Sequence, residues 1–259
     1  MLQFRYLTSE GPVEGTAESP DELAAYTLAR PIDPPEVWCA GVTYQRSRDA
    51  RVGESVVKDV YTLVYDADRP ELFMKDAACR RTVGPGDPIG VRGDSGWDVP
   101  EPEIGVVLGE GGALVGLTIG NDVSSRAIEG ENPLYIAQAK TFAGACAIGP
   151  AILVPDDWEK QLEIHLRITD AGGAELFAGE TSSGKMRRSF PELVEWLLRD
   201  NPVPPGSVLL TGTGLVPPDD FTLRPGHVVE ITVPEIGTLS NPVVAASELI
   251  TTKRSELHV

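Results

Sequence analysis

The stretch EPEIGVVLG, residues 101–109, places two acidic residues directly before a short apolar run. The run is rich in β-branched residues and is followed by a glycine pair, so it predicts a strand that ends in a turn. Side chains of a strand alternate between its two faces, and Glu101 and Glu103 therefore point the same way. Like charges at the mouth of a buried strand repel each other, so the pair needs a neutralising partner.

A third acid, Asp122, ends the next apolar segment, GLTIGND at 116–122. Residues 104–121 are expected to fold as a hairpin that turns at GEGGA (109–113) and pairs Glu103 with Asp122. Three converging carboxylates suit a hard cation, Mg²⁺ above all, with Mn²⁺ or Ca²⁺ as alternatives. Because an E-x-E pair is also common on solvated strand edges, the residues alone leave that alternative open.

The composition excludes some classes of protein. The chain has 259 residues and a net charge of −17, which argues against nucleic acids and anionic membranes as partners. The three cysteines are widely spaced and form no C-x-x-C motif, so a reducing cytoplasm is expected. The start of the chain resembles no signal peptide, and no apolar run reaches the length of a membrane span.

The hydrophobic pattern predicts a mixed, β-rich α+β fold in two parts. Residues 1–37 are expected to form a small segment of strand, turn, strand and a short helix in SPDELAAYTLAR (19–30), ending at the proline-rich PIDPPEV. Residues 38–259 form the main domain, with one clear helix in SFPELVEWLLRDN (189–201). Because strands do not alternate regularly with helices, a parallel Rossmann sheet is disfavoured. Strands are predicted at 37–42, 103–109, 113–119, 146–154, 161–169, 207–211 and 227–233.

Four segments appear in a characteristic order: EPEIGVVLG, GLTIGNDVSSR, QAKTFAGACAIGPAI and VLLTGTGLVPPDDFTLRPGHVVEITVPEIGTLSNPV. Together they resemble the fumarylacetoacetate hydrolase family over roughly residues 38–245. The resemblance implies a β-roll or sandwich-like C-terminal domain, a homodimer, and Mg²⁺ or Ca²⁺ bound by Glu101, Glu103 and Asp122. A cation would thus neutralise the acidic pair.

Hydrolases of this family carry a His and a Glu in a segment to which GVTYQRSRDA (41–50) corresponds, and here Ser47 and Ala50 replace them. The segments GVTYQRSR, RPELFMK and ENPLYIAQAK instead resemble the sugar-acid branch, which is similar to 2-keto-3-deoxy-D-arabinonate dehydratase. The resemblance implies a lyase that dehydrates a 2-keto-3-deoxy sugar acid. The 2-oxo acid would chelate the cation, which stabilises the enolate formed when a C3 proton leaves, and the C4 hydroxyl follows.

Six further residues are candidates for catalysis or substrate binding. Lys140 matches the family's lysine near the metal and is a candidate acid or base together with Glu71. Glu71 and Lys75 lie four residues apart on a predicted strand and therefore share a face, although an exposed ion pair is an equal alternative. The predicted substrate-binding residues are Arg46, Ser47, Lys75 and Thr213.

Two other functions stay open at this level. One is a hydrolase, decarboxylase or tautomerase that acts on another β-dicarbonyl compound or 2-oxo acid. The other is a non-catalytic ligand-binding protein, which the missing His–Glu pair and Ala143, in place of a frequent family acid, would favour. The intact acidic residues and Lys140 speak against this last alternative.

Overall fold

The predicted hairpin is present, with a different register. The computed structural model describes residues 1–46 and 58–250, and in it β9 (Pro102–Leu108) pairs with β10 (Leu114–Asp122). The expected pairing of Glu103 with Asp122 is wrong, because Glu103 lies opposite Gly120 and the Asp122 N–H donates to the carbonyl of Glu101 (3.0 Å). The 109–113 turn closes tightly, and one irregularity adds a single residue to β10. Asp122 therefore lies opposite Glu101.

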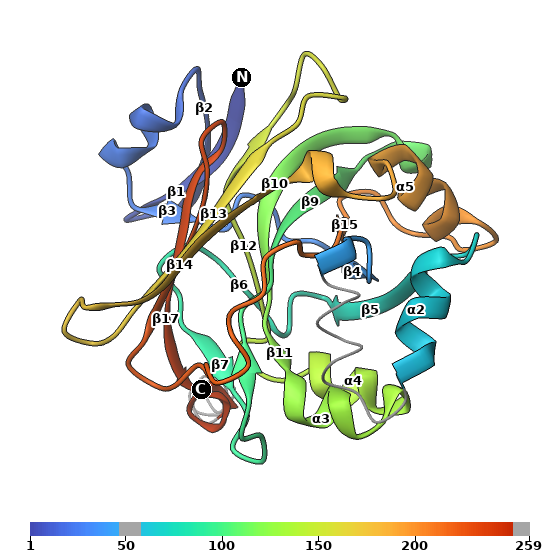
Figure 1. Ribbon diagram of the computed structural model, residues 1–259. Coiled ribbons are helices and arrows are strands. Elements are labelled where there is room, and N and C mark those ends of the chain that lie inside the picture. The colour runs from blue at the N-terminus through green and yellow to red at the C-terminus, as the bar shows by residue number, and fades with distance from the viewer. Residues whose placement is uncertain (47–57, 251–259) are drawn as a thin grey trace.

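The hairpin lies at the centre of a ten-stranded mixed sheet (Figure 1). Its strand order is β2-β1-β12-β10-β9-β15-β4-β5, with β3 beside β1 and β6 beside β12. β15 runs antiparallel to β9 and parallel to β4, so it joins segments far apart in the sequence. The remaining strands of this sheet are β1 (Leu2–Thr8), β2 (Gly11–Ala17), β3 (Leu28–Ala29), β4 (Glu36–Gly41), β5 (Glu71–Ala77), β6 (Thr82–Val83), β12 (Cys146–Leu153) and β15 (Val208–Leu210).

A second sheet of five strands packs against the first, with β12 and β17 in contact. Along β13 and β16 buried and more exposed residues alternate, as expected for a sheet with one face on the core and one toward solvent. Its order is β14 (Glu175–Ser182), β13 (Glu163–Thr169), β16 (Val228–Val233), β17 (Gly237–Ala245) and β7 (Ile89–Val91), and β8 (Asp98–Val99) pairs separately with β11 (Ser124–Ser125). The β-rich mixed fold class is confirmed.

Short helices surround the sheets. α3 (Arg126–Glu131) and α4 (Ile136–Lys140) pack together, and α4 also contacts β5 and β11 (Figure 1). The predicted helix at 189–201 is α5 (Phe190–Leu198), capped by Ser189, whose hydroxyl accepts from the Glu192 N–H (3.3 Å). The other helices are α2 (Lys58–Asp66) and the 3₁₀ turns η1 (Pro20–Ala25), η2 (Glu110–Gly112), η3 (Pro133–Tyr135) and η4 (Ser183–Lys185). Among the described helices, none has the length and apolarity that crossing a membrane requires.

The predicted helix at 19–30 is reduced to the single 3₁₀ segment η1, because the chain turns extended at Tyr26 and residues 28–29 join the sheet as β3. The predicted domain boundary at residue 37 falls inside β4, and β1 pairs with β12 across it. The division into two domains therefore stays a prediction.

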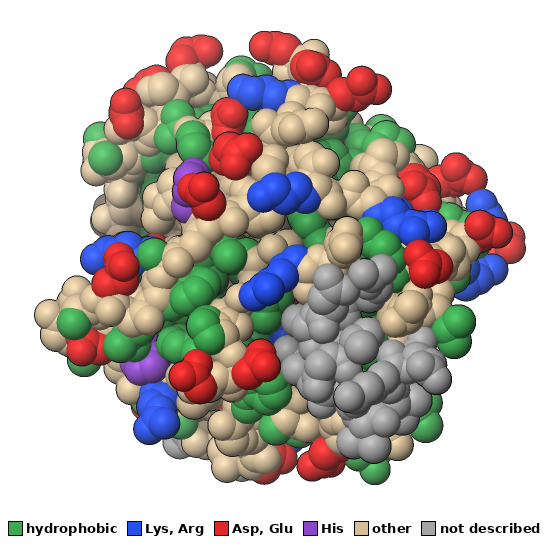
Figure 2. Space-filling view, viewed as in Figure 1, with side chains coloured by type: hydrophobic (Ala, Val, Ile, Leu, Met, Phe, Trp, Pro, Cys, Tyr) green, Lys and Arg blue, Asp and Glu red, His purple; other side chains and the backbone are tan. Residues whose placement is uncertain are grey.

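The strands that carry the acidic residues are deeply buried. Every residue of β9 is buried, and apolar side chains cover both faces of the central sheet, since Val106 and its neighbour Val107 belong to different core clusters. On the face seen in Figure 2, acidic and basic side chains are scattered over the surface. The buried acidic residues described below are thus a separate feature from the acidic surface.

We expect truncation of Leu209 in β15 to destabilise the protein strongly. Leu209 is completely buried between β9 and β4, whereas Leu134 in η3 is 85% exposed. Leu209→Ala should lower the free energy of unfolding by about 2–5 kcal/mol, and the control Leu134→Ala by no more than about 0.5 kcal/mol. Urea denaturation measures both. Equal effects would contradict this account of the core.

Candidate metal centre and substrate cavity

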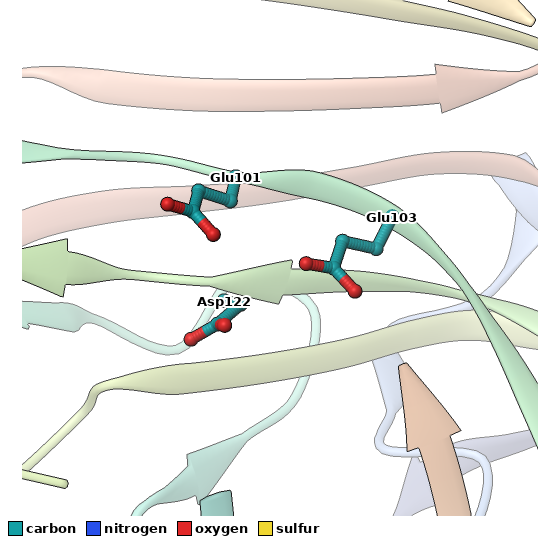
Figure 3. Close-up of side chains that lie close together, drawn as sticks. All are labelled: Glu101, Glu103 and Asp122. Atoms are coloured by element: carbon teal, nitrogen blue, oxygen red, sulfur yellow. The ribbon is translucent and has the colours of Figure 1, made fainter. Parts of the chain in front are cut away.

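Three carboxylates converge at the start of the β9–β10 hairpin (Figure 3). Glu101 directly precedes β9, Glu103 lies within it, and Asp122 ends β10. All three side chains are buried, and each offers an oxygen within 4.8 Å of the others. The predicted convergence of these residues is confirmed, and as hard oxygen donors they fit Mg²⁺.

Backbone contacts hold two of these residues. The Asn121 side chain accepts a hydrogen bond from the Glu101 N–H (3.2 Å), and Glu103 Oε2 accepts one from the Gly212 N–H (2.6 Å). Gly212 has a φ of +93°, and a Cβ there would lie 2.0 Å from Thr43 Oγ1. Only glycine fits this position without strain. The TGTG loop thus helps to fix a candidate metal ligand.

Cationic side chains also contact the triad. Lys140 Nζ, from α4, lies 2.7 Å from Glu101 Oε2 and 2.9 Å from Asp122 Oδ2, and it donates to Ser124 Oγ. Arg126 Nη2, from α3, lies 3.2 Å from Glu101 Oε1. These contacts offset part of the cost of burying like charges together.

Lys75 is the second lysine of the site, and it is completely buried. Its Nζ forms an ion pair with Asp122 Oδ1 and donates to the Val123 carbonyl (2.9 Å). Each carboxylate oxygen of Asp122 therefore contacts a different lysine. The alternative of an exposed Glu71–Lys75 ion pair is wrong, because Lys75 is completely buried and its ammonium pairs with Asp122.

The local field acts most strongly on Glu103. Burial, and then the negative charges of Asp122 and Glu101, raise the pKa of Glu103 well above its ordinary value, while Lys140 and the Gly212 N–H oppose this shift. A divalent cation among the three carboxylates would favour their charged forms. The triad is thus a place where a cation is electrostatically preferred.

A small cavity of about 20 Å³ lies beside the triad. One wall comes from β4 and β5, with Gly41, Glu71 and Phe73, and another from the helices, with Tyr61, Glu129 and Ile136. A Cβ at position 41 would lie 2.0 Å from Glu71 Oε2, so Gly41 makes room for this carboxylate. Its free volume is that of about one water molecule or ion, and carboxylates contribute much of its lining.

Three of the six further candidates line the cavity. Lys140, Glu71 and Thr213 line the cavity, and Thr213 Oγ1 also exchanges hydrogen bonds with the backbone of Leu215. Lys75 contacts Asp122 and is not among the lining residues. Arg46 is exposed and is likewise absent from the lining, and Ser47 lies outside the described residues. The roles assigned to all of these residues stay predictions.

Sequence reasoning missed three residues of the site. Arg126 contacts Glu101, and Glu129 and Tyr61 line the cavity. Arg126 and Glu129 lie on a helix of only six residues, too short for a periodic pattern to reveal which side faces inward. The burial of charged residues in α3 is the signal, and it appears only in the folded structure.

The fold and the acidic site define a family. Residues 36–244 match the model described as fumarylacetoacetate (FAA) hydrolase C-terminal, and the chain belongs to the fumarylacetoacetate hydrolase family.

Similar proteins within the family include sugar-acid dehydratases. The chain is 54% identical over 214 residues to a probable 2-keto-3-deoxyxylonate dehydratase of Haloferax volcanii, covering 82% of this chain and 73% of the relative. It is 46% identical over 222 residues to 2-dehydro-3-deoxy-D-arabinonate dehydratase of Saccharolobus solfataricus, covering 83% and 74%. A solved structure of 2-keto-3-deoxy-D-arabinonate dehydratase complexed with magnesium and 2,5-dioxopentanoate aligns with a TM-score of 0.79 and 42% identity, over 90% of this chain and 83% of that one.

We expect Mg²⁺ to raise the thermal unfolding temperature of the protein after treatment with EDTA, because a ligand that binds only the native state stabilises it. Glu103→Gln should lose this rise, since the amide removes one ligand charge from the triad. The exposed Glu131 supplies the control, and Glu131→Gln should keep the rise. A scan of all three proteins with and without Mg²⁺ checks this, and a full Mg²⁺ response in Glu103→Gln would contradict the site.

We expect Lys75→Met to destabilise the protein in EDTA by about 3–5 kcal/mol, because it leaves the buried Asp122 carboxylate without one of its cationic partners. Lys160→Met serves as the control, because Lys160 forms a surface ion pair with Glu235 (2.9 Å), and should cost less than about 1 kcal/mol. Urea denaturation compares the two variants. Similar values would show that Lys75 is not a buried counter-charge.

Proposed function

We propose that the protein is a Mg²⁺-dependent hydro-lyase that removes water from a 2-keto-3-deoxy sugar acid. The observation that carries this proposal is the buried triad of Glu101, Glu103 and Asp122 with Lys140 against two of its members. Similarity to two sugar-acid dehydratases, and to a dehydratase structure that contains magnesium, supports the same reaction class.

The substrate we favour is a five-carbon acid such as 2-keto-3-deoxy-D-arabinonate, after which the dehydratase in one of the similar structures is named. Its 2-oxo acid end suits the triad, because a carboxylate and a neighbouring ketone are the oxygen donors that a hard cation prefers. When bound, Mg²⁺ would stabilise the negative charge that develops on the ketone oxygen as a proton leaves C3. The rest of the substrate would extend toward the walls that carry Glu71 and Glu129.

Side chains of this protein are proposed to transfer the protons and to hold the substrate. Lys140, whose Nζ donates to Glu101, is proposed to give a proton to the leaving C4 hydroxyl or to the developing oxyanion. Glu71, on the sheet wall, is the proposed base for the C3 proton. The Thr213 loop is proposed to hold the substrate carboxylate. Arg46 and Ser47 are kept as substrate-binding residues, and Lys75 would act on the substrate through Asp122.

Mass spectrometry of the products decides between the reaction classes. The enzyme is incubated with Mg²⁺ and a panel of 2-oxo acids that includes 2-keto-3-deoxy-D-arabinonate. Loss of 18 Da supports the dehydratase. Cleavage with gain of water would indicate a hydrolase, loss of 44 Da a decarboxylase, and an unchanged mass with a new isomer a tautomerase. If no compound changes, the protein is a ligand-binding member of the family.

Lys140→Met should separate catalysis from binding. The variant removes the ammonium and should weaken binding of pyruvate by only about 1–2 kcal/mol, the value of one charge-assisted hydrogen bond. Turnover should fall about 10²–10⁴-fold, as expected on loss of a general acid or base. Glu103→Gln should lose both Mg²⁺ and pyruvate binding. Calorimetry and turnover at the same Mg²⁺ concentration test this, and equal loss of pyruvate binding in both variants would refute the division of roles.

We further propose a homodimer that works in a reducing cytoplasm. Cys39, Cys79 and Cys146 are free thiols, which fits such a compartment. Apolar side chains are exposed on and near the N-terminal strands, including Leu7 and Tyr26, as at many subunit contacts. Light scattering at micromolar concentration should give twice the mass of the chain. A single monomeric mass would contradict the dimer.

A further inference from the structure

Two carboxylates outside the triad line the cavity, and they come from different walls. Glu71 extends from β5 in the sheet, and Glu129 extends from α3. Glu71 is half-buried, whereas Glu129 is only 3% exposed. A carboxylate buried in a cavity that already holds three others is costly, and such arrangements are typical of functional sites.

The position of Glu129 relative to the triad is well defined. α3 begins at Ser125, whose hydroxyl accepts from the Ile128 N–H (3.3 Å), and the Arg126 N–H donates to the Trp97 carbonyl (2.8 Å). Arg126, one helical turn before Glu129, also contacts Glu101 (3.2 Å). The helix that carries Glu129 is therefore tied to a candidate metal ligand, and the carboxylate keeps a fixed place in the cavity.

The proposed reaction needs a second proton transfer, at a carbon farther than C3 from the ketone that the triad would bind. Loss of a C3 proton and of the C4 hydroxyl converts the five-carbon acid to 5-hydroxy-2-oxopent-3-enoate, which is an isomer of 2,5-dioxopentanoate and is not an aldehyde. To reach the aldehyde, a C5–H bond and the O–H bond must break, and C3–H and C4–H bonds must form. C5 is three bonds from the ketone carbon, so a second base on another wall of the cavity can act there.

We infer that Glu129 is the residue that acts at C5, an inference that rests on the proposed function. Glu129 accepts the C5 proton while C3 regains a proton from the group that first removed one, which leaves an enol between C4 and C5. Glu129 then gives its proton to C4, and the enol hydroxyl proton passes to the group that protonated the departing hydroxyl. One water is released, every group regains its initial state, and no oxidant or reductant is consumed.

The cavity has one carboxylate on each of two walls, and the proposed reaction removes a proton from each of two carbons. With the 2-oxo acid unit at the triad, Glu71 serves C3 from the sheet and Glu129 serves C5 from the helix. Glu129 would also distinguish sugar acids from simple 2-oxo acids, because its carboxylate accepts a hydrogen bond from the C5 hydroxyl that the simple acids lack.

Real-time proton NMR of the Mg²⁺-loaded enzyme with 2-keto-3-deoxy-D-arabinonate tests the inference. The wild type should yield the aldehyde or its hydrate without visible intermediate. Glu129→Gln should still eliminate water but release 5-hydroxy-2-oxopent-3-enoate, seen by its vinyl protons, with aldehyde formation slowed about 10²-fold or more relative to water loss. Glu129→Asp, which keeps the acid but withdraws it, should release the same enone in smaller amount.

Two matched variants complete the test. Glu131→Gln, on the exposed side of the same helix, should give the wild-type product ratio, and Glu71→Gln should slow water loss without release of the enone. The inference is overturned if Glu129→Gln and Glu129→Asp form aldehyde and water in the wild-type ratio, or if Glu71→Gln is the variant that releases the enone. A wild type that loses no water from the sugar acid would instead refute the proposed function itself.

Discussion

Repulsion among three buried carboxylates is the constraint on which the rest of this structure depends. Pairing of β9 with β10 brings Glu101, Glu103 and Asp122 within a few ångströms of one another, away from solvent. Such a cluster is stable only if positive charge is supplied. The chain supplies it from three directions, through Lys75 on the sheet, Lys140 on α4 and Arg126 on α3, whose charges balance those of the triad. The helices are thereby tied to the sheet around a single electrostatic centre.

This balance explains why the site suits a cation, through which an anionic substrate can bind in an acidic protein. Among the described residues, Glu71 and Glu129 add two carboxylates to the triad, so five acidic residues face three basic ones and the local excess is two negative charges. A bound divalent cation cancels this excess and removes the repulsion that a 2-oxo acid would otherwise meet. Binding of cation and substrate is thus coupled by charge, while the negative surface contributes solubility rather than recognition.

Residues close together in the sequence were predictable, and those brought together by tertiary packing were not. The hairpin, α5 and the convergence of the triad follow from short apolar runs, a Ser–Pro start and two acidic positions on one face of a strand. The predicted register of β9 and β10 was wrong by two residues. Hydrophobic periodicity encodes neither the tightness of a glycine turn nor the one-residue irregularity in β10. Glu129 was missed because it lies on a helix of six residues, too short for a periodic pattern to show which side faces inward.

The insertion of β15 between β9 and β4 has a consequence for the order of events during folding. β15 joins residues 36–41 to residues 102–108 in the sheet, and it follows the first of these segments by more than 160 residues in the sequence. The Gly212 N–H that holds Glu103 follows it directly. Contacts at such sequence separation form slowly and late. On a ribosome the acidic hairpin is therefore complete long before its last fixed contact exists, and a nascent chain carries an unfinished cation site until most of the protein has been synthesised.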